Sequence, residues 1–421
     1  MQQAIKIGDL RQKLLFTLLM FGLFRLGAHI PVPGINADAM AELLKNQLFG
    51  FFDIISGGAF KRFSIFAMSI TPYINASIIM QLLTVVIPSL ERLSKEGEEG
   101  RKKMTQYIRY GTVILGFIQA IGMAVALSRY PVNGKLVVES AGIGSILLIA
   151  VSLTAGTALL MWIGEMITEK GIGNGISLII FAGIVARIPS GVVNVVEYVT
   201  AGTVSIFRVL LFIVVALLVI AAVVAINEGQ RRIPVQYAKR VVGRKVYGGQ
   251  STFLPLRVNM AGVIPIIFAM SIMMFPATIG SWFRNSAFNN FINAYFNFGT
   301  PLYNIIYALL IIFFTYFYTA VIFNPLDVAD NIKKYGGFIP GIRPGRPTAE
   351  YIDKVLSRLT LVGGVFLAFI AILPNFVIAL TGLTSVWFGG TALLIVVGVA
   401  LDTMKQVEAH LLLRSYEGFV K

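Results

Sequence analysis

The amino-acid sequence predicts an all-α polytopic membrane protein. Of its 421 residues, 57% are hydrophobic and only 13% are charged, and its mean hydropathy is +0.80. An ordinary soluble chain is about half apolar and about a quarter charged. The apolar residues also occur in long stretches, many near the roughly 20 residues that cross a bilayer core. These observations exclude a soluble enzyme held to a membrane by a single tether.

We expect a transmembrane helix in each of ten apolar stretches. The first follows a polar segment, as the apolar part of a secretory signal would. It runs on to Pro31 without a small-x-small cleavage pattern, so we expect it to be retained. The ten stretches are residues 14–30, 68–88, 107–127, 143–163, 172–190, 207–226, 258–281, 302–323, 359–380 and 386–402.

The loops define a topology. An even number of spans places both termini on one side of the membrane, and the loops on that side carry most of the 35 Lys and Arg residues. By the positive-inside rule, that side is the cytoplasm. Because five spans precede residue 200 and five follow it, the second half enters from the opposite face. The sequence therefore predicts two pseudo-symmetric inverted halves, residues 1–200 and 201–421, with a working site where they meet.

Residues 49–66 are too short and too polar to form a span. Their apolar stretch is interrupted by Asp53, by Gly57 and Gly58, and by a Lys-Arg pair. They lie on the outer side just before the second span. We expect a re-entrant or half-inserted helix here, and an amphipathic helix on the outer surface is the alternative.

The spans hold almost no ionisable side chains. Arg25 and His29 lie toward one end of the first span, where we expect structural pairing or snorkelling rather than a proton relay. Residues 171–175 lack the spacing of a phosphate-binding loop, and no catalytic Ser-His-Asp set is evident. The chain has no cysteine and only two histidines. The sequence therefore predicts no enzyme, no cofactor and no metal site.

The loop at residues 227–257 combines cations with aromatic residues. We expect a protruding two-stranded hairpin that turns near Gly243 or near Gly248 and Gly249. Such a surface suits a phosphate backbone or an acidic protein. The alternative explanation is that the cations only orient the protein in the membrane and contact anionic lipid. This would account for the charge of the loop but not for its length.

A second long basic loop is expected at residues 326–358. Its run 338–347 is rich in Pro and Gly. Since proline fixes φ, this run should present Arg343 and Arg346 in a set conformation.

Six stretches of the chain resemble one known family closely. They are residues 69–77, 95–103, 171–177, 230–232, 255–262 and 340–345. Together they resemble the SecY/Sec61-alpha family, the channel-forming subunit of the bacterial Sec protein translocase, over nearly the whole chain. The resemblance implies a channel of the bacterial plasma membrane, with cytoplasmic termini, that passes unfolded preproteins across the membrane and releases hydrophobic segments sideways into lipid.

The resemblance also implies positions for the working parts. The two five-helix halves enclose a central pore, a plug precedes the second span, and a lateral gate separates spans two and three from spans seven and eight. Periodicity alone would make the pore-ring isoleucines core residues. The implied pore ring is Ile70, Ile74, Ile176, Ile180, Ile267 and Ile395, and the implied plug includes Phe51, Phe52, Ile54, Ile55, Gly57 and Gly58.

Gln81 and Asn259 are the polar residues that the resemblance places at the lateral gate. A mutual hydrogen bond would hold the gate shut, and a structural bond elsewhere is the alternative. The implied docking residues for a motor or ribosome are Arg231, Arg232, Lys239, Arg240, Arg244, Lys245, Arg343 and Arg346. The implied partners are SecE, SecG, the SecA ATPase, the ribosome, signal peptides with their preproteins, and anionic lipids.

Two other classes of protein fit parts of the sequence. An inverted-repeat secondary transporter of a small solute would share the topology, but it should carry charge within the membrane. A lipid-binding scaffold would share the hydropathy, but it has no need for protruding arginine-rich loops.

Overall fold

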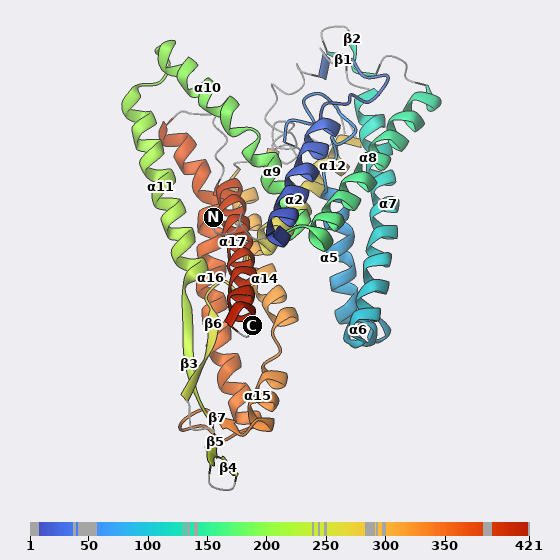
Figure 1. Ribbon diagram of the computed structural model, residues 1–421. Helices are drawn as coiled ribbons and strands as arrows, with labels where there is room; N and C mark the ends of the chain where they lie inside the picture. Colours follow the sequence, from blue (N-terminus) through green and yellow to red (C-terminus); the bar gives the residue numbers. More distant parts are fainter. Residues whose placement is uncertain are drawn as a thin grey trace.

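Long helices form most of the structure, a computed structural model, and they lie side by side in two groups (Figure 1). The structure describes residues 8–36, 39–40, 57–128, 131–132, 135–138, 142–237, 240–242, 245–247, 251–282, 291, 294–296, 300–381 and 390–419.

Each of the ten expected spans coincides with a helix. The first group is α2 (Gly8–Gly27), α5 (Thr71–Val86), α7 (Glu98–Ser128), α8 (Ile143–Lys170) and α9 (Gly175–Val185). The second is α11 (Ile206–Glu228), α12 (Ile264–Trp282), α14 (Pro301–Ile322), α16 (Arg346–Thr381) and α17 (Gly390–Phe419). Helix α12 packs on α14 and also contacts α5 and α7, so it lies at the boundary between the groups. Six helical segments of the described chain are long and apolar enough to cross a membrane, or seven if α5 and the following α6 count as one bent span. The predicted helical, polytopic fold is confirmed.

Helix α11 shows why a membrane is the natural solvent of these helices. Only 11% of its apolar window is buried within the protein, although its hydropathy is the highest of the six. Leu210, Leu217 and Leu218 are more than half exposed. A helix that is apolar on all sides and barely covered by protein matches a surface in contact with lipid.

Several helices extend beyond the predicted spans, and two of them, α5 and α9, are interrupted at a proline-containing break. Helix α5 ends at Val86 because Ile87 precedes a proline and adopts an extended conformation, and α6 (Pro88–Lys95) then turns away by 104°. Helix α9 ends at Val185, and a separate helix, α10 (Ile188–Thr200), restarts with Pro189 in its first turn. Together, α9 and α10 form one candidate membrane span of 26 residues, Gly175–Thr200, which overlaps the expected span 172–190 and continues beyond it toward α11 (Figure 1).

The segment before α5 is not helical where it is described. Residues 57–70 form turns, so the expected helix over 49–66 is wrong for 57–66, while 49–56 lie outside the described residues. Gly57 and Gly58 have φ of +64° and +88°, values that an α-helix does not contain. Short antiparallel strands β1 (Pro131–Val132) and β2 (Lys135–Leu136) lie between α7 and α8.

A small sheet occupies the basic loop between α11 and α12. Strand β3 (Gln230–Tyr237) pairs antiparallel with β6 (Ser251–Arg257), as the predicted hairpin requires. At its tip, β4 (Arg240–Val242) pairs with β5 (Lys245–Tyr247), so the chain reverses between Val242 and Lys245 rather than near Gly248. A third strand, β7 (Gly337–Phe338), adds to β3 from the other basic loop and was not predicted.

The second basic loop is folded as well. It contains α15 (Pro325–Lys334) and β7, and α16 begins at Arg346, well before the expected span 359–380. Residues from both loops bury a common apolar cluster, formed by Ile233, Val235, Leu256, Ile332, Ile339 and Ile352. We name the sheet, α15 and the first turns of α16 the cytoplasmic domain. The two predicted loops are therefore one structured unit.

Gly156 of α8 provides a test of this packing. A Cβ at Gly156 would collide with the carbonyl oxygen of Ile65 in the turn segment, whereas a Cβ at Gly144 of the same helix meets open space. We expect Gly156→Ala to destabilise the protein by about 1 to 3 kcal/mol, as overpacking does. The midpoint of thermal unfolding in detergent should fall for this variant and stay level or rise for Gly144→Ala. Equal midpoints for both variants would contradict the packing.

Candidate functional site

Six isoleucines from four regions of the chain meet where the two groups of helices face each other. Five are buried in one apolar cluster, and Ile176 packs against it. Ile70 is the residue just before α5, and Ile74 lies within α5. Ile176 and Ile180 lie on α9, Ile267 lies on α12, and Ile395 lies on α17. The exposed fractions are 1% for Ile70, 6% for Ile74, 2% for Ile180, 6% for Ile267 and 1% for Ile395. The cluster is larger than the six isoleucines and includes buried apolar and aromatic residues of α2, α8, α11, α14 and α16, so the isoleucines lie within an extended dry apolar zone.

The described end of the expected plug lies against α9. Gly57 is buried, and a Cβ added to it would lie 2.7 Å from the Cα atom of Gly183, one turn beyond Ile180. Only a glycine allows the two backbones to approach this closely at a positive φ. Phe51, Phe52, Ile54 and Ile55 lie outside the described residues.

The two polar residues expected at the lateral gate do not bond to each other. The Gln81 amide donates to the Ser77 hydroxyl at 3.2 Å, one turn back in α5. The Asn259 amide donates to Asn227 Oδ1 at 2.8 Å and to the Gly262 carbonyl at 3.1 Å. The mutual hydrogen bond is therefore wrong in this conformation, because each amide group is engaged within its own group of helices. The side-chain oxygens of Gln81 and Asn259 are buried without a partner in the described structure.

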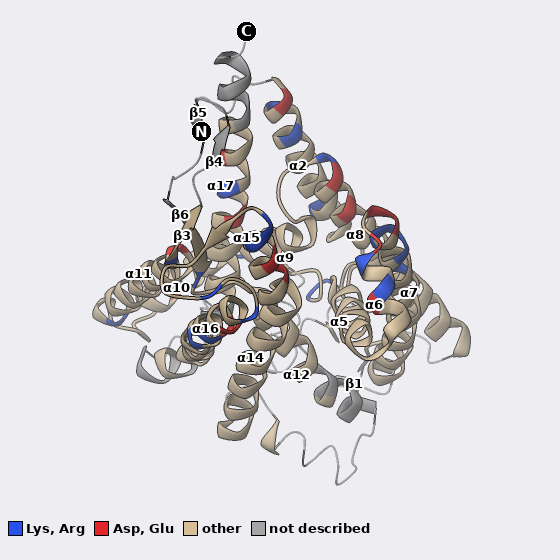
Figure 2. Cartoon of the chain, turned by 90° about the horizontal axis from the view of Figure 1, so that it is seen from below, with Lys and Arg blue, Asp and Glu red and all other residues tan. Residues whose placement is uncertain are grey.

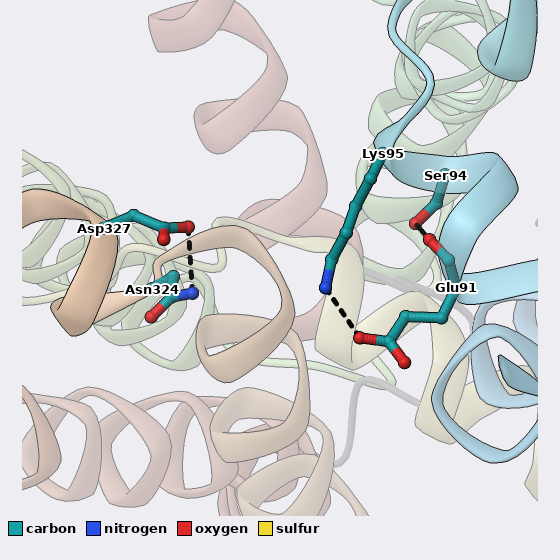
Figure 3. A network of polar contacts seen from close by, with 5 residues as sticks. All are labelled: Glu91, Ser94, Lys95, Asn324 and Asp327. Carbon is teal, nitrogen blue, oxygen red and sulfur yellow. Dashed lines mark hydrogen bonds and ion pairs between the residues drawn. The ribbon is translucent and has the colours of Figure 1, made fainter.

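Charges of opposite sign face each other at the cytoplasmic edge between the two groups (Figure 3). On α6, Lys95 forms an ion pair with Glu91 at 2.7 Å. This hydrogen bond raises the pKa of Lys95, and Asp327 on α15 adds to the effect from across the gap. Asp327 accepts a hydrogen bond from the Asn324 amide at 2.9 Å. Because these groups are exposed, their attraction should weaken as salt screens it.

The turn between α8 and α9 connects the two groups of helices. The Gly173 amide donates to Gln406 Oε1 of α17 at 2.9 Å, and its φ of +89° favours glycine. The next residue, Asn174, caps α9 by accepting from the Ser177 amide. As predicted, the turn runs directly into the fifth span.

A cavity of about 420 Å³ lies beside this turn, on the cytoplasmic side of the isoleucines. Asn174, Asn259, Asp402 and Lys405 are among the polar residues that line it. Lys405 also pairs with Glu228 at 2.8 Å. A cavity lined by both polar and apolar residues thus borders the dry apolar zone.

The expected docking residues gather on the cytoplasmic domain. Arg231 and Arg232 lie on β3 and are exposed, as is Arg343 in the turn before α16. Arg346 is the first residue of α16 rather than part of a loop, and it pairs with Glu350 at 3.6 Å. Arg240 is in β4 and Lys245 is in β5, the two strands that pair at the hairpin tip, while Lys239 and Arg244 lie outside the described residues.

Seen from the cytoplasmic side, charged residues lie on α6, on α15 and at nearby helix ends, while the membrane-spanning parts of the helices are mostly uncharged (Figure 2). The sequence located the cations of the cytoplasmic domain but missed α15 and β7, which hold Asp327 and the third strand. A short amphipathic pattern after Pro325 was the available signal for α15.

Comparison with known proteins decides the family. The profile described as SecY matches residues 64–404. The chain belongs to the SecY family. The protein translocase subunit SecY of Halalkalibacterium halodurans is 50% identical over 424 residues, covering 99% of this chain and 98% of that relative. The Escherichia coli K12 protein of the same name is 50% identical over 421 residues, covering 99% of this chain and 95% of its own.

Solved structures of the SecY channel fold match this fold. One matches with a TM-score of 0.69 at 19% identity, covering 95% of this chain and 92% of that chain. It is described as showing that the plug domain of the SecY protein stabilises the closed state of the translocation channel and maintains a membrane seal. Sec61 in the canine ribosome-channel complex from the endoplasmic reticulum matches with a TM-score of 0.66 at 18% identity, again covering 95% and 92%.

Membership of the SecY family fixes the class of function. The chain is a protein-conducting channel subunit of a protein translocase, and a multi-pass protein of the bacterial plasma membrane. The expected function is confirmed, and the transporter and scaffold alternatives are set aside.

The charge arrangement at the cytoplasmic edge generates a prediction. Lys95→Glu replaces the cation between Glu91 and Asp327 with a third anion, so we expect α6 and α15 to move apart. Because the chain has no cysteine, spin labels on Ser94→Cys and Asn331→Cys report this distance by pulsed electron spin resonance without background labelling.

The control is Lys102→Glu, which makes the same charge change at a residue paired with Glu98 on α7. The α6 to α15 distance should lengthen only in Lys95→Glu, and it should lengthen in the parent protein at high salt. A distance that is the same in all variants and at all salt concentrations would refute the attraction.

Proposed function

We propose that unfolded preproteins cross the membrane through a constriction formed by Ile70, Ile74, Ile176, Ile180, Ile267 and Ile395. The observation that supports this role is the meeting of these side chains, from both groups of helices, in and against one dry cluster. The division into halves at residue 200 is part of the same proposal, because the ring then lies between them.

The chemistry of isoleucine suits both tasks of such a ring. A narrow aliphatic constriction excludes water, and an ion crossing it dry would face an idealised solvation penalty on the order of tens of kcal/mol. The methyl groups offer no hydrogen bond to a moving polypeptide. The ring therefore bars salt at rest and does not retain the chain that passes.

A plug on the outer side, formed around Phe51, Phe52, Ile54, Ile55, Gly57 and Gly58, would complete the resting seal. Two observations support it. Gly57 packs directly on α9, the helix that carries two ring isoleucines. A solved structure of the same fold is described in terms of a plug that maintains a membrane seal.

Sideways release of hydrophobic segments would take place between α5 and α7 on one side and α12 and α14 on the other. Near the centre of a membrane, each Leu-like residue favours lipid by about 0.3 to 0.6 kcal/mol and each charge opposes it by about 2.5 to 3.5 kcal/mol. About ten apolar residues therefore suffice, and one or two charges cancel their effect. In this proposal, Gln81 and Asn259 lie at the lateral gate with unpaired side-chain oxygens and do not bond to each other.

The energy for movement would come from partners docked on the cytoplasmic domain. Its exposed arginines suit the acidic surface of a motor such as SecA or the phosphates of ribosomal RNA. SecE and SecG would cover lipid-facing helices, anionic lipids would contact the basic face, and signal peptides with their preproteins would be the substrates. A ribosome-bound channel among the structural neighbours supports the ribosome as one partner.

Ion leakage tests the ring. We expect channels carrying both Ile74→Ser and Ile180→Ser to conduct ions at rest in planar bilayers, because hydroxyl groups let water fill the constriction. Ile311→Ser is the matched control, since Ile311 is fully buried in the same cluster but is not part of the proposed ring. Tight channels in the double variant would refute the ring, as would equal leakage in the control.

Export tests the docking surface. We expect Arg343→Glu to lower the rate of motor-driven export into vesicles about tenfold or more, because reversing a docking charge turns attraction into repulsion. Arg343 is exposed, so the thermal unfolding midpoint should not change. Lys354→Glu makes the same charge change at an exposed site on α16 and should export normally. Normal export by Arg343→Glu would remove that residue from the docking surface.

A further inference from the structure

The turn that carries Arg343 is bonded to a buried side chain of the cytoplasmic domain. The Thr348 hydroxyl donates to the Arg343 carbonyl at 2.8 Å, five residues back along the chain. Thr348 is 1% exposed, whereas Arg343 is exposed. The backbone of an exposed arginine is thus connected to the interior of the domain.

Thr348 is firmly held at its own position. It is the third residue of α16, and the amides of Thr348 and Ala349 both donate to the Gly345 carbonyl, at 3.0 and 3.1 Å. Ala349 is 3% exposed, and Ile352, one turn after Thr348, is fully buried in the apolar cluster of the domain. Because the helix and this cluster fix the backbone of Thr348, its hydroxyl is a stable point of attachment for the turn.

The turn contains two residues with unusual backbone freedom. Gly341 and Gly345 have φ of +81° and +97°, values that suit glycine, and a Cβ at either position would meet open space. Pro344 fixes only its own φ and narrows the choices of Arg343 before it. The Arg343 carbonyl lies between the two glycines, so the bond from Thr348 restrains the stretch of the turn that is freest to change.

We propose that Thr348 is a positioning residue for docking: its buried hydroxyl fixes the conformation in which Arg343 is presented to the acidic surface of a bound motor. This inference rests on the proposed docking role of Arg343. An arginine on a fixed turn loses less conformational entropy when its guanidinium group meets a carboxylate than one on a flexible turn. Thr348 itself is buried, so it acts through Arg343 and does not touch the motor.

Motor-driven export into vesicles that hold the complete translocase tests this role, with the SecA ATPase as the motor. We expect Thr348→Val, which keeps the branched shape and removes the hydroxyl, to raise the motor concentration at half-maximal export about fivefold, the change that loss of one hydrogen bond produces. The maximal rate should stay close to that of the parent, because only binding is weakened. Thr348→Ser keeps the hydroxyl and should restore most of the affinity.

Thr154→Val is the matched control. Thr154 is also buried, and its hydroxyl donates to the Ala150 carbonyl at 2.7 Å within the membrane-spanning α8. This variant should leave the motor concentration at half-maximal export unchanged, and an increase equal to that of Thr348→Val would overturn the positioning role. If Thr348→Val does not assemble, Thr348→Ala removes the same hydroxyl with a smaller side chain.

A double-mutant cycle with Arg343→Ala separates positioning from a general structural effect. Arg343→Ala keeps the carbonyl that accepts from Thr348 and removes the guanidinium group. Since Thr348 acts through that group, Thr348→Val should not weaken motor binding further when Arg343→Ala is already present. An undiminished effect in the double variant would overturn the positioning role, because the hydroxyl would then support motor binding by another route.

The same variants distinguish failure of this inference from failure of the docking surface. If Arg343→Ala weakens motor binding and Thr348→Val does not, the positioning role is overturned and the docking role stands. If Arg343→Ala binds the motor as tightly as the parent does, both roles are overturned.

Discussion

The contact between the two groups of helices is apolar on both sides, and the working of the channel depends on that property. Helices α5, α7 and α9 meet α12 and α17 there, and the isoleucines lie in their shared cluster. Lipid tails are as apolar as these side chains, so no hydrophobic driving force holds such helices together in a membrane. The groups can therefore exchange their mutual contact for lipid, or for a passing hydrophobic segment, at little cost.

Polar contacts between the groups lie at the cytoplasmic edge of this interface. Gly173 bonds to Gln406, and Lys95 faces Asp327. Directional bonds at one edge of the interface limit how far the two groups of helices separate and fix the axis about which they rotate. The centre of the interface can still open.

Hydropathy was sufficient to locate the spans, because a helix surrounded by lipid must itself carry apolar side chains. All ten predicted stretches overlap helices, and six or seven helical segments of the described residues are long and apolar enough to cross a membrane. The hairpin of β3 and β6 was equally local, since its strands and turn lie within one loop.

What sequence reasoning missed depends on residues that are distant along the chain. Strand β7 joins β3 from about a hundred residues away, and Ile352 completes an apolar cluster begun at Ile233. The start of α16 was missed for a different reason. Hydropathy reports where a helix enters lipid and not where its backbone begins, so a helix that continues into water looks like a loop. The bond expected between Asn259 and Gln81 was wrong, because the sequence does not show which acceptor an amide group will meet.

The length of α16 has a mechanical consequence. At 36 residues it is about 54 Å long at 1.5 Å per residue, and it carries Ile352 of the cytoplasmic cluster and Leu367 and Ile370 of the central one. The helix is unbroken between those positions, and its internal proline, Pro374, lies beyond them. A displacement of the cytoplasmic cluster is thus transmitted along one continuous helix to the central cluster.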